Sequence, residues 1–269
     1  MTVAIKNIIG NFKKYAFLMQ QLISRDFKVK YKRSVLGVVW SLLYPILMTA
    51  VMAIVFSQMF RFQVEGVNYI VYLMIGNVMF NYFNEASNAA MTSVVTNFPL
   101  MTKVYIPKYI FPLSKCLFSG INFLLTLIPL LFLILFTGSG DTRCVISLWY
   151  LLLPYVFLCG FLFTVGIGFI LSTISVFLRD MFYIYGVIVM IWNYVTPVFY
   201  DISIIPATLQ PLFRLNPLYM FINGAREIIL FGRCPATGDL IGMTVYAIVF
   251  VILGAVVFKK NKDKFIYDA

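Results

Sequence analysis

The sequence predicts an all-α integral membrane protein with six transmembrane helices. Apolar residues make up 62% of the chain and charged residues only 12%, where a soluble domain has about 25% charged residues. Six stretches contain no Lys, Arg, Asp or Glu, and each can form a helix that crosses a bilayer, which takes about 20 residues. The second helix is expected to continue past Glu85 toward residue 93. The charge-free stretches are 34–60, 66–84, 116–140, 144–178, 181–200 and 240–258.

The first 34 residues predict an amphipathic helix followed by a basic segment. Apolar side chains recur at helical spacing from Ile5 to Ile23, and polar ones such as Lys13 and Gln20 occupy the other face. No compact apolar stretch with a small-residue cleavage site follows, so this is not a secretory signal. Such a helix lies in the membrane interface or packs on a partner protein, and it can do both.

The distribution of cations predicts that both termini are cytoplasmic. With that orientation, eight Lys and Arg before residue 35 lie inside. Loops on the inner side carry most cations of a membrane protein. Also inside are Lys103, Lys108, Lys115, Arg179, Lys259, Lys260, Lys262 and Lys264, whereas Arg61, Arg143, Arg214, Arg226 and Arg233 are outside. The net charge of +11 therefore reflects topology, and no nucleic-acid-binding module accompanies it.

The segment 201–238 is apolar but is interrupted by Pro206, Pro211 and Pro217. Its two apolar stretches are too short to span a bilayer. Such stretches form re-entrant or interfacial segments. We expect either a re-entrant segment after the fifth helix or an amphipathic loop on the outer leaflet.

A basic stretch, RDFKVKYKRSVLGVVWSLLYP at 25–45, runs directly into the first membrane helix. Its cations Lys28, Lys30, Lys32 and Arg33 are candidates for contact with lipid headgroups or phosphate, at about 1 kcal/mol each. They also serve as topogenic charges, and the two roles are compatible. Gly37 is expected to permit close approach of a neighbouring helix.

This stretch resembles the type-2 ABC exporter permeases that export O-antigen, capsule or teichoic-acid polymers. The resemblance continues along nearly the whole chain, in YIPKYIFPLSK at 105–115, FLRD at 177–180, TPVFYDISIIP at 196–206 and NPLYMFINGAR at 216–226. IGNVMFNYF at 75–83 departs from the family, whose members often have a Pro and a Trp there. This departure affects the expected details of the second helix.

The resemblance implies a single transmembrane domain over 1–269, with the interface helix and basic segment at 1–34, six membrane helices at 35–258 and a cytoplasmic tail at 259–269. It implies a homodimer that works with two ABC ATPase subunits and moves lipid-linked polysaccharide or teichoic acid across the bacterial cytoplasmic membrane. Helices one and five would surround the translocation path. Their aromatic rings suit passing sugars or form the interfacial aromatic belt. The candidates are Trp40, Tyr44, Trp192, Tyr194, Phe199 and Tyr200.

The chain has no GxxxxGK[ST] stretch, so ATP and Mg are expected on the partner ATPase. The segment 97–115 is the candidate docking surface, because it mixes apolar side chains with cations between two spans. Its coupling residues are Phe98, Pro99, Leu100 and Met101. Arg179 and Asp180 are a second candidate contact, or a salt bridge that contributes little.

Four asparagines, Asn77, Asn81, Asn84 and Asn88, form a polar stripe on the second helix. They either line a path that binds sugar hydroxyls or act as hydrogen-bonding contacts between helices, and the sequence favours the second role. Glu85 is expected to be an interfacial carboxylate near the cytoplasmic side.

Other protein classes fit the sequence less well. The chain has no histidine, and its four cysteines show no metal-ligand spacing, although Cys144 and Cys234 could pair. An integral membrane enzyme acting on sugar-lipids would need acidic residues grouped at a site, and the ten acids are scattered. A secondary transporter would show an inverted repeat or buried acids.

Overall fold

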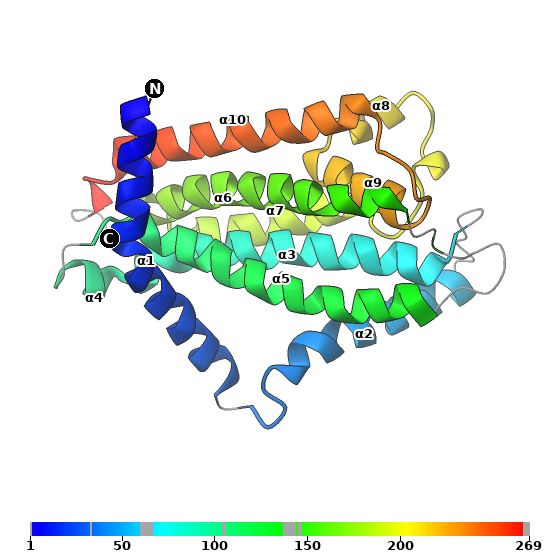
Figure 1. Ribbon diagram of the computed structural model, residues 1–269, viewed down its shortest axis with the longest axis horizontal. Helices are drawn as coiled ribbons and strands as arrows, with labels where there is room; N and C mark the ends of the chain where they lie inside the picture. The colour runs from blue at the N-terminus through cyan, green and yellow to red at the C-terminus, as the bar shows by residue number, and fades with distance from the viewer. Residues whose placement is uncertain are drawn as a thin grey trace.

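The computed structural model describes residues 2–32, 34–59, 67–103, 106–136, 144 and 147–265, and within these ranges it contains helices and no strand. The helices form an elongated bundle (Figure 1). Helix α1 (Thr2–Tyr31) begins, and α10 (Thr237–Asn261) ends, at the same end of the bundle, here called the terminal end. The short α8 (Gln210–Arg214) lies at the opposite, distal end. The all-helical prediction is confirmed.

Each charge-free stretch contains a helix. Three of these are long and apolar enough to cross a membrane, namely α5 (Ile110–Phe136), the η3–α6 helix (Leu148–Phe177) and α10. Two apolar helices are shorter, α2 (Val39–Ala53) and α7 (Met181–Val195). The remaining helices of these stretches are α3 (Tyr69–Thr96), which extends three residues beyond the expected residue 93, the π-helical η1 (Ile54–Met59), η3 (Leu148–Leu152) and α6 (Leu153–Phe177).

Helix α3 forms the centre of the bundle. It packs against α2, α5, α6, α7 and α9, and every residue from Val71 to Val78 is buried. Asn68 caps its first turn by accepting hydrogen bonds from the N–H groups of Ile70 and Val71. Because protein surrounds α3, polar side chains such as Ser87 are shielded from the apolar surroundings of the bundle.

Helices α6 and α10 pack along their lengths with their backbones in contact. A Cβ added to Gly166 would lie 2.3 Å from the carbonyl carbon of Phe250, and one added to Gly254 would lie 2.4 Å from the carbonyl oxygen of Gly166. No side chain fits between the two helices at this crossing. Helices that approach this closely are held by van der Waals contact between their backbones.

Helices α1 and α2 form a V that projects from the bundle (Figure 1). At its turn, Gly37 has a φ of 49°, in the left-handed region that glycine adopts readily. A Cβ there would meet only two backbone oxygens, at 3.9 and 4.0 Å. The prediction that Gly37 permits close helix packing is therefore wrong; its role is to allow the turn.

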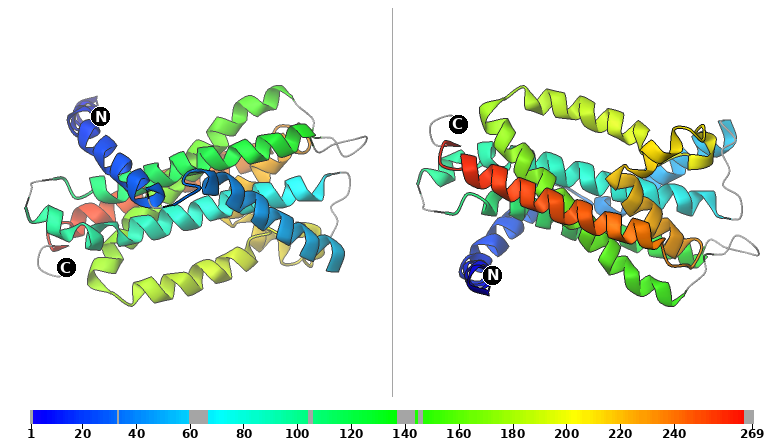
Figure 2. Two further views of the ribbon diagram at one scale, coloured as in Figure 1. Left: turned by 90° about the horizontal axis from the view of Figure 1, so that it is seen from below. Right: turned by 90° about the horizontal axis from the view of Figure 1, so that it is seen from above.

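Helix α7 has few contacts with the rest of the bundle. Figure 2 shows it running along one side of the molecule, and within it only Tyr185 and Val189 are buried. Most of its other apolar side chains are exposed, including Tyr183, Met190 and Tyr194. This leaves an apolar face that no other described part of the chain covers.

The segment after α7 returns into the bundle at the distal end. It contains η4 (Ile202–Ile204), α8 and α9 (Pro217–Ile229), and α9 packs against α3, α6 and α10. Most residues of α9 are buried, so this helix does not lie as a loop on the surface. Asn216 caps α9 and also donates from its amide to Thr196, which ties α9 to the end of α7.

Candidate functional site: a cavity between α1, α2, α3 and α5

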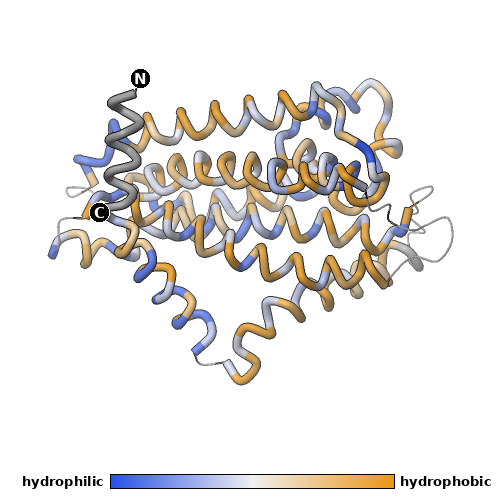
Figure 3. The backbone as a smooth tube through the Cα atoms, viewed as in Figure 1, coloured by the Kyte–Doolittle hydropathy of each residue, from blue (hydrophilic) through white to orange (hydrophobic). Residues whose placement is uncertain are grey.

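A cavity of about 430 Å³ lies inside the V of α1 and α2, against α3 and α5. Figure 3 shows that the surrounding helices are mainly hydrophobic, whereas hydrophilic residues gather at the terminal end and in the second half of α1. The cavity lies where the polar part of α1 reaches the apolar bundle. It is lined by Lys30, Tyr31, Trp40, Ser41, Tyr44, Pro45, Val78, Asn81, Tyr82, Glu85, Ser119, Asn122, Phe123 and Thr126.

One ion pair crosses the cavity. Lys30 Nζ on α1 lies 2.7 Å from Glu85 Oε1 on α3, and both side chains are partly exposed. The amide of Asn122 on α5 donates to the same carboxylate oxygen at 3.2 Å. The two charges therefore neutralise each other within the cavity, and α1, α3 and α5 are linked by one set of polar contacts.

Tyr31 joins α2 to this set. Its hydroxyl forms a short hydrogen bond with Ser41 on α2 and donates to Asn122 Oδ1 at 3.0 Å. The ring of Phe27, one turn earlier on α1, packs against Tyr31. Four elements thus meet at the polar end of the cavity, which the sequence analysis did not foresee. A polar residue inside a charge-free stretch, here Asn122, was the available signal.

Aromatic rings form much of the remaining wall. Trp40 and Tyr44 lie one helical turn apart on α2 and are about half exposed, so the structure brings two of the six candidate path residues to one cavity. Tyr82 and Phe123 face each other with ring centroids 4.9 Å apart. Aromatic walls with a few polar groups are typical of ligand sites.

The other four candidate path residues lie elsewhere. Trp192 is packed between Phe83 and Phe163 and donates from its indole to Asn216. Phe199 stacks on Phe56 with centroids 5.2 Å apart. The exposed Tyr194 accepts, through its carbonyl, a hydrogen bond from the Tyr200 hydroxyl at 2.7 Å. None of these four lines the cavity.

The candidate phosphate contacts divide between two faces of α1. Lys30 faces the cavity, whereas Lys28 and Lys32 line a shallow hollow with Arg25 on another face. Lys28 and Lys32 have no ion-pair partner among the described residues. Arg33 lies outside the described residues.

The polar stripe on α3 forms its hydrogen bonds along the helix. Asn81 donates to Asn77 at 2.7 Å, and Asn88 donates to Asn84 at 2.6 Å. Among the described residues these asparagines make no hydrogen bond to another helix. The favoured interpretation of the stripe as interhelical contacts is not met within one chain, because the side-chain bonds run between consecutive turns of α3 and the buried amide nitrogen of Asn77 has no partner among the described residues. Only Asn81 lines the cavity.

The candidate docking segment contains a short helix at the terminal end. Helix α4 (Phe98–Met101) presents an exposed Pro99, while Leu100 and Met101 pack against Leu22 of α1 and the start of α5. Residues 104–105 of this segment lie outside the described residues. Burial lowers the pKa of Lys108, whose ammonium group donates to the carbonyl of Lys262 beyond α10.

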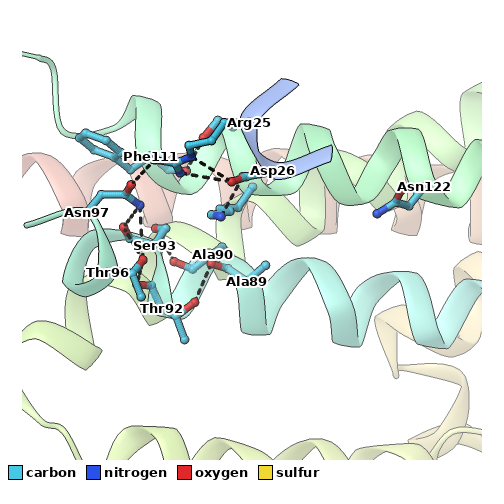
Figure 4. A network of polar contacts seen from close by, with 12 residues as sticks. Arg25, Asp26, Ala89, Ala90, Thr92, Ser93, Thr96, Asn97, Phe111 and Asn122 are labelled. Atoms are coloured by element: carbon cyan, nitrogen blue, oxygen red, sulfur yellow. Dashed lines mark hydrogen bonds and ion pairs between the residues drawn. The ribbon is translucent and has the colours of Figure 1, made fainter. Parts of the chain in front are cut away.

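Helix α4 is joined to α1 through buried polar contacts, which Figure 4 shows. Arg25 donates to the side chain of Asn97, directly before α4, at 3.0 Å. Its neighbour Asp26 is 8% exposed and pairs with Arg25 at 3.2 Å and with Lys115 of α5 at 2.8 Å. Arg179 and Asp180 are exposed in the turn between α6 and α7, and the salt bridge considered for them is not formed.

A buried cation lies at the distal end. Arg226 on α9 is 2% exposed and donates to the carbonyls of Pro197, Val198 and Tyr72 at 2.7, 2.8 and 3.2 Å. Its guanidinium group lies 3.5 Å from the centre of the Tyr72 ring. Gly76 leaves room for it, since a Cβ there would be 2.6 Å from Nη2. The sequence placed Arg226 among the outer cations and gave no indication that it is buried.

The described residues contain no group of three or more His, Cys, Asp or Glu that could hold a metal ion. All four cysteines are free, so the pairing considered for Cys144 and Cys234 is not formed.

The chain is similar to a known protein family and to several known proteins. A family described as ABC-2 type transporter matches residues 18–230. An O-antigen export system permease protein RfbA from Klebsiella pneumoniae is 28% identical over 267 residues, which cover 98% of each chain. One from Myxococcus xanthus is 25% identical over 260 residues, covering 96% of this chain and 97% of its own. The capsule polysaccharide export inner-membrane protein CtrC of Neisseria meningitidis is 23% identical over 215 residues, covering 79% of this chain and 75% of its own.

Proposed function

The chain belongs to the ABC-2 type transporter family, and on this premise we propose that it is the membrane permease subunit of an ABC exporter of polysaccharide. The full-length relatives are named as O-antigen and capsule export proteins, which supports that polymer class. We further propose that the polymer is carried on a lipid and crosses the bacterial cytoplasmic membrane. Export of teichoic acid stays an expectation from the resemblance alone.

The cavity is the observation that connects the proposed function with particular residues. Two candidate sugar-contacting rings, Trp40 and Tyr44, line it together with Lys30. Lys28 and Lys32, which pair with no acid among the described residues, line the hollow on the other face of the chain next to Lys30. Aromatic faces and cations beside one another suit a sugar attached to phosphate. Since Glu85 neutralises Lys30, we assign the phosphate contact to Lys28 and Lys32.

The proposed topology has six spans and both termini in the cytoplasm. It is supported by the three long apolar helices, and by the beginning of α1 and the end of α10, which lie together at the terminal end of the bundle. In this topology α1 is an interface helix and α9 is part of a re-entrant segment. The test labels single cysteines placed at Thr208 and Lys262 with an impermeant maleimide in whole cells. Labelling at residue 208 alone is expected, and labelling at 262 alone would reverse the orientation.

The proposed assembly contains two copies of this chain and two ATPase subunits, which bind ATP and Mg. The exposed Pro99 of α4 supports docking of the ATPase at the terminal end, with the exposed turn at Arg179 and Asp180 as a second contact. The uncovered apolar face of α7 supports pairing with a second copy. Tyr194 lies on that face, so we keep it, with Phe199 and Tyr200, as a candidate for the path. Trp192 is packed in the core and is assigned to stability instead.

The test of the proposed function is export by cells that lack this chain. We expect deletion to abolish surface polysaccharide and the wild-type chain to restore it, with the ATPase recovered in the same purified complex. Alanine replacement of Phe98, Leu100 and Met101 should lower recovery of the ATPase. Normal surface polysaccharide after deletion would contradict the proposed function.

A further inference from the structure

We propose that the cavity between α1, α2, α3 and α5 binds one uncharged sugar ring of the substrate, and that Glu85, Asn122 and Ser119 select its hydroxyl groups. This inference rests on the proposed function, because the sugar is taken to belong to the exported polymer. It assigns a binding role to three residues for which neither the sequence patterns nor the relatives' names suggest one.

The two charged side chains of the cavity neutralise each other. Lys30 and Glu85 are paired at 2.7 Å, so the cavity has no unpaired charge for a phosphate or another ion to neutralise. A charged ligand would have to separate this pair and leave one member without its partner. A neutral, hydroxyl-rich ring needs no such separation.

The cavity has hydrogen-bonding capacity that the described part of the chain does not use. Among these residues Glu85 accepts two hydrogen bonds, both through Oε1, so Oε2 can accept one from a sugar hydroxyl. The Lys30 ammonium group has three hydrogens and donates one to Glu85. Hydrogen bonds to charged groups are the stronger ones, so a hydroxyl group reaching both side chains would be held well.

Ser119 on α5 contributes a buried hydroxyl group to the cavity. Its side chain is 1% exposed, and its hydroxyl oxygen has no hydrogen-bond partner among the residues that the structure describes. Most serines inside helices satisfy this group by bonding to a carbonyl of the preceding turn, as Ser114 does. A buried hydroxyl group without a partner is costly, and a ligand hydroxyl in the cavity would satisfy it.

The size and the walls of the cavity also suit a sugar ring. The cavity volume is at the lower part of the range for ligand sites, roughly 300 to 1,000 Å³. Trp40, Tyr44 and Tyr82 contribute rings to its wall. The C–H faces of a pyranose pack on such rings, while its hydroxyl groups project from the edge of the sugar toward the polar end of the cavity.

The test places a photo-crosslinking residue, p-benzoylphenylalanine, at Thr126 or at Leu124 of the complete exporter in cells. Both residues lie on α5, but Thr126 lines the cavity, whereas Leu124 is 59% exposed and does not. We expect a polysaccharide adduct from position 126 and none from position 124. An adduct with phospholipid alone would identify a lipid-headgroup site and overturn the proposal. If both variants export normally and neither forms an adduct, the sugar site is excluded while the proposed function stands.

Substitutions separate binding from folding. Ser119→Ala removes a hydroxyl group that the protein itself does not use, so thermal stability should be unchanged or higher while the polysaccharide adduct and export decrease. Glu85→Gln should lower export by roughly tenfold, the loss expected for a hydrogen bond to a charged group. Asn88→Ala is the control, because Asn88 bonds only within α3. Unchanged export by both Ser119→Ala and Glu85→Gln would overturn the proposal.

Discussion

Lys30 and Arg226 are both cations that reach into an apolar helix bundle, yet their surroundings differ in kind. Arg226 is almost fully buried and bonds to three backbone carbonyls, so it holds α9, α3 and the segment after α7 in one arrangement. Lys30 is partly exposed beside a cavity and has one ion-pair partner. Arg226 is enclosed by protein and fixes structure through the backbone bonds of its two terminal nitrogens, whereas Lys30 borders a cavity that a ligand can enter.

Replacing Arg226 should have the largest effect on stability. Arg226→Met leaves three buried carbonyls without their donor, and each loss costs about 1 to 3 kcal/mol. Thermal unfolding of the purified chain in detergent measures this effect. Arg233→Met is the matched control, since Arg233 is exposed, and its pKa is raised by the hydrogen bond to Glu227, an interaction expected to contribute at most about 1 kcal/mol. Equal losses of stability from the two substitutions would show that the buried Arg226 stabilises the chain no more than the exposed Arg233 does.

Gly76→Ala on α3 tests the packing around Arg226. The added Cβ would lie 2.6 Å from Arg226 Nη2 and 3.0 Å from the Val198 carbonyl oxygen. We expect a loss of about 1 to 3 kcal/mol, the range for overpacking. Gly186→Ala on α7 is the control, because no atom lies within 4 Å of its Cβ and alanine favours a helix by roughly 0.5 to 1 kcal/mol. The two alanines should shift the unfolding temperature in opposite directions.

A substitution at the interface between α1 and α4 should lower the stability of the chain to an intermediate degree. Asp26→Asn removes the carboxylate charge next to Arg25 and Lys115. Asp26 is buried, so stability should fall by about 2 kcal/mol or more. If α1 transmits movement from the ATPase, the ATPase activity of the complex should also become uncoupled from export. A change in stability with unchanged coupling would leave Asp26 with a structural role alone.

Lys30→Met should have the smallest effect on stability. Its ion pair with Glu85 is partly exposed, and such pairs contribute about 0 to 1 kcal/mol. We nevertheless expect a clear loss of export, because the cavity then keeps an unpaired carboxylate. Surface polysaccharide at matched expression gives the export measurement. A large drop in unfolding temperature would show that Lys30 stabilises the bundle as Arg226 does.

The helices were predictable from the sequence because they follow from local composition. Each charge-free stretch contains a helix, since consecutive apolar residues leave the backbone no other way to satisfy its hydrogen bonds in lipid. The start of α5 at Ile110 was missed because Lys115 interrupts the apolar stretch. That lysine is accommodated by the buried Asp26, which is 89 residues away in the chain and which no local pattern indicates.

The cavity could be predicted only in part. Trp40, Tyr44 and Lys30 are close in sequence, so the basic stretch and its aromatic residues indicated them. Tyr31 and Asn122 meet across 91 residues, and this contact depends on how α1 and α5 pack. The burial of Arg226 could not be predicted, because its carbonyl partners Pro197 and Val198 come from another segment and no local pattern indicates them.

The backbone contact between α6 and α10 has a mechanical consequence. Where Gly166 faces Gly254, no side chain lies between the two helices, so a rotamer change cannot accommodate a shift of one helix against the other. Relative movement of the two helices would require their backbones to separate. We expect this pair to move as a rigid body, together with the central α3. Helix α7, which contacts the centre at few places, is then free to swing. During transport the polymer would then meet a mobile α7 beside a rigid group formed by α3, α6 and α10.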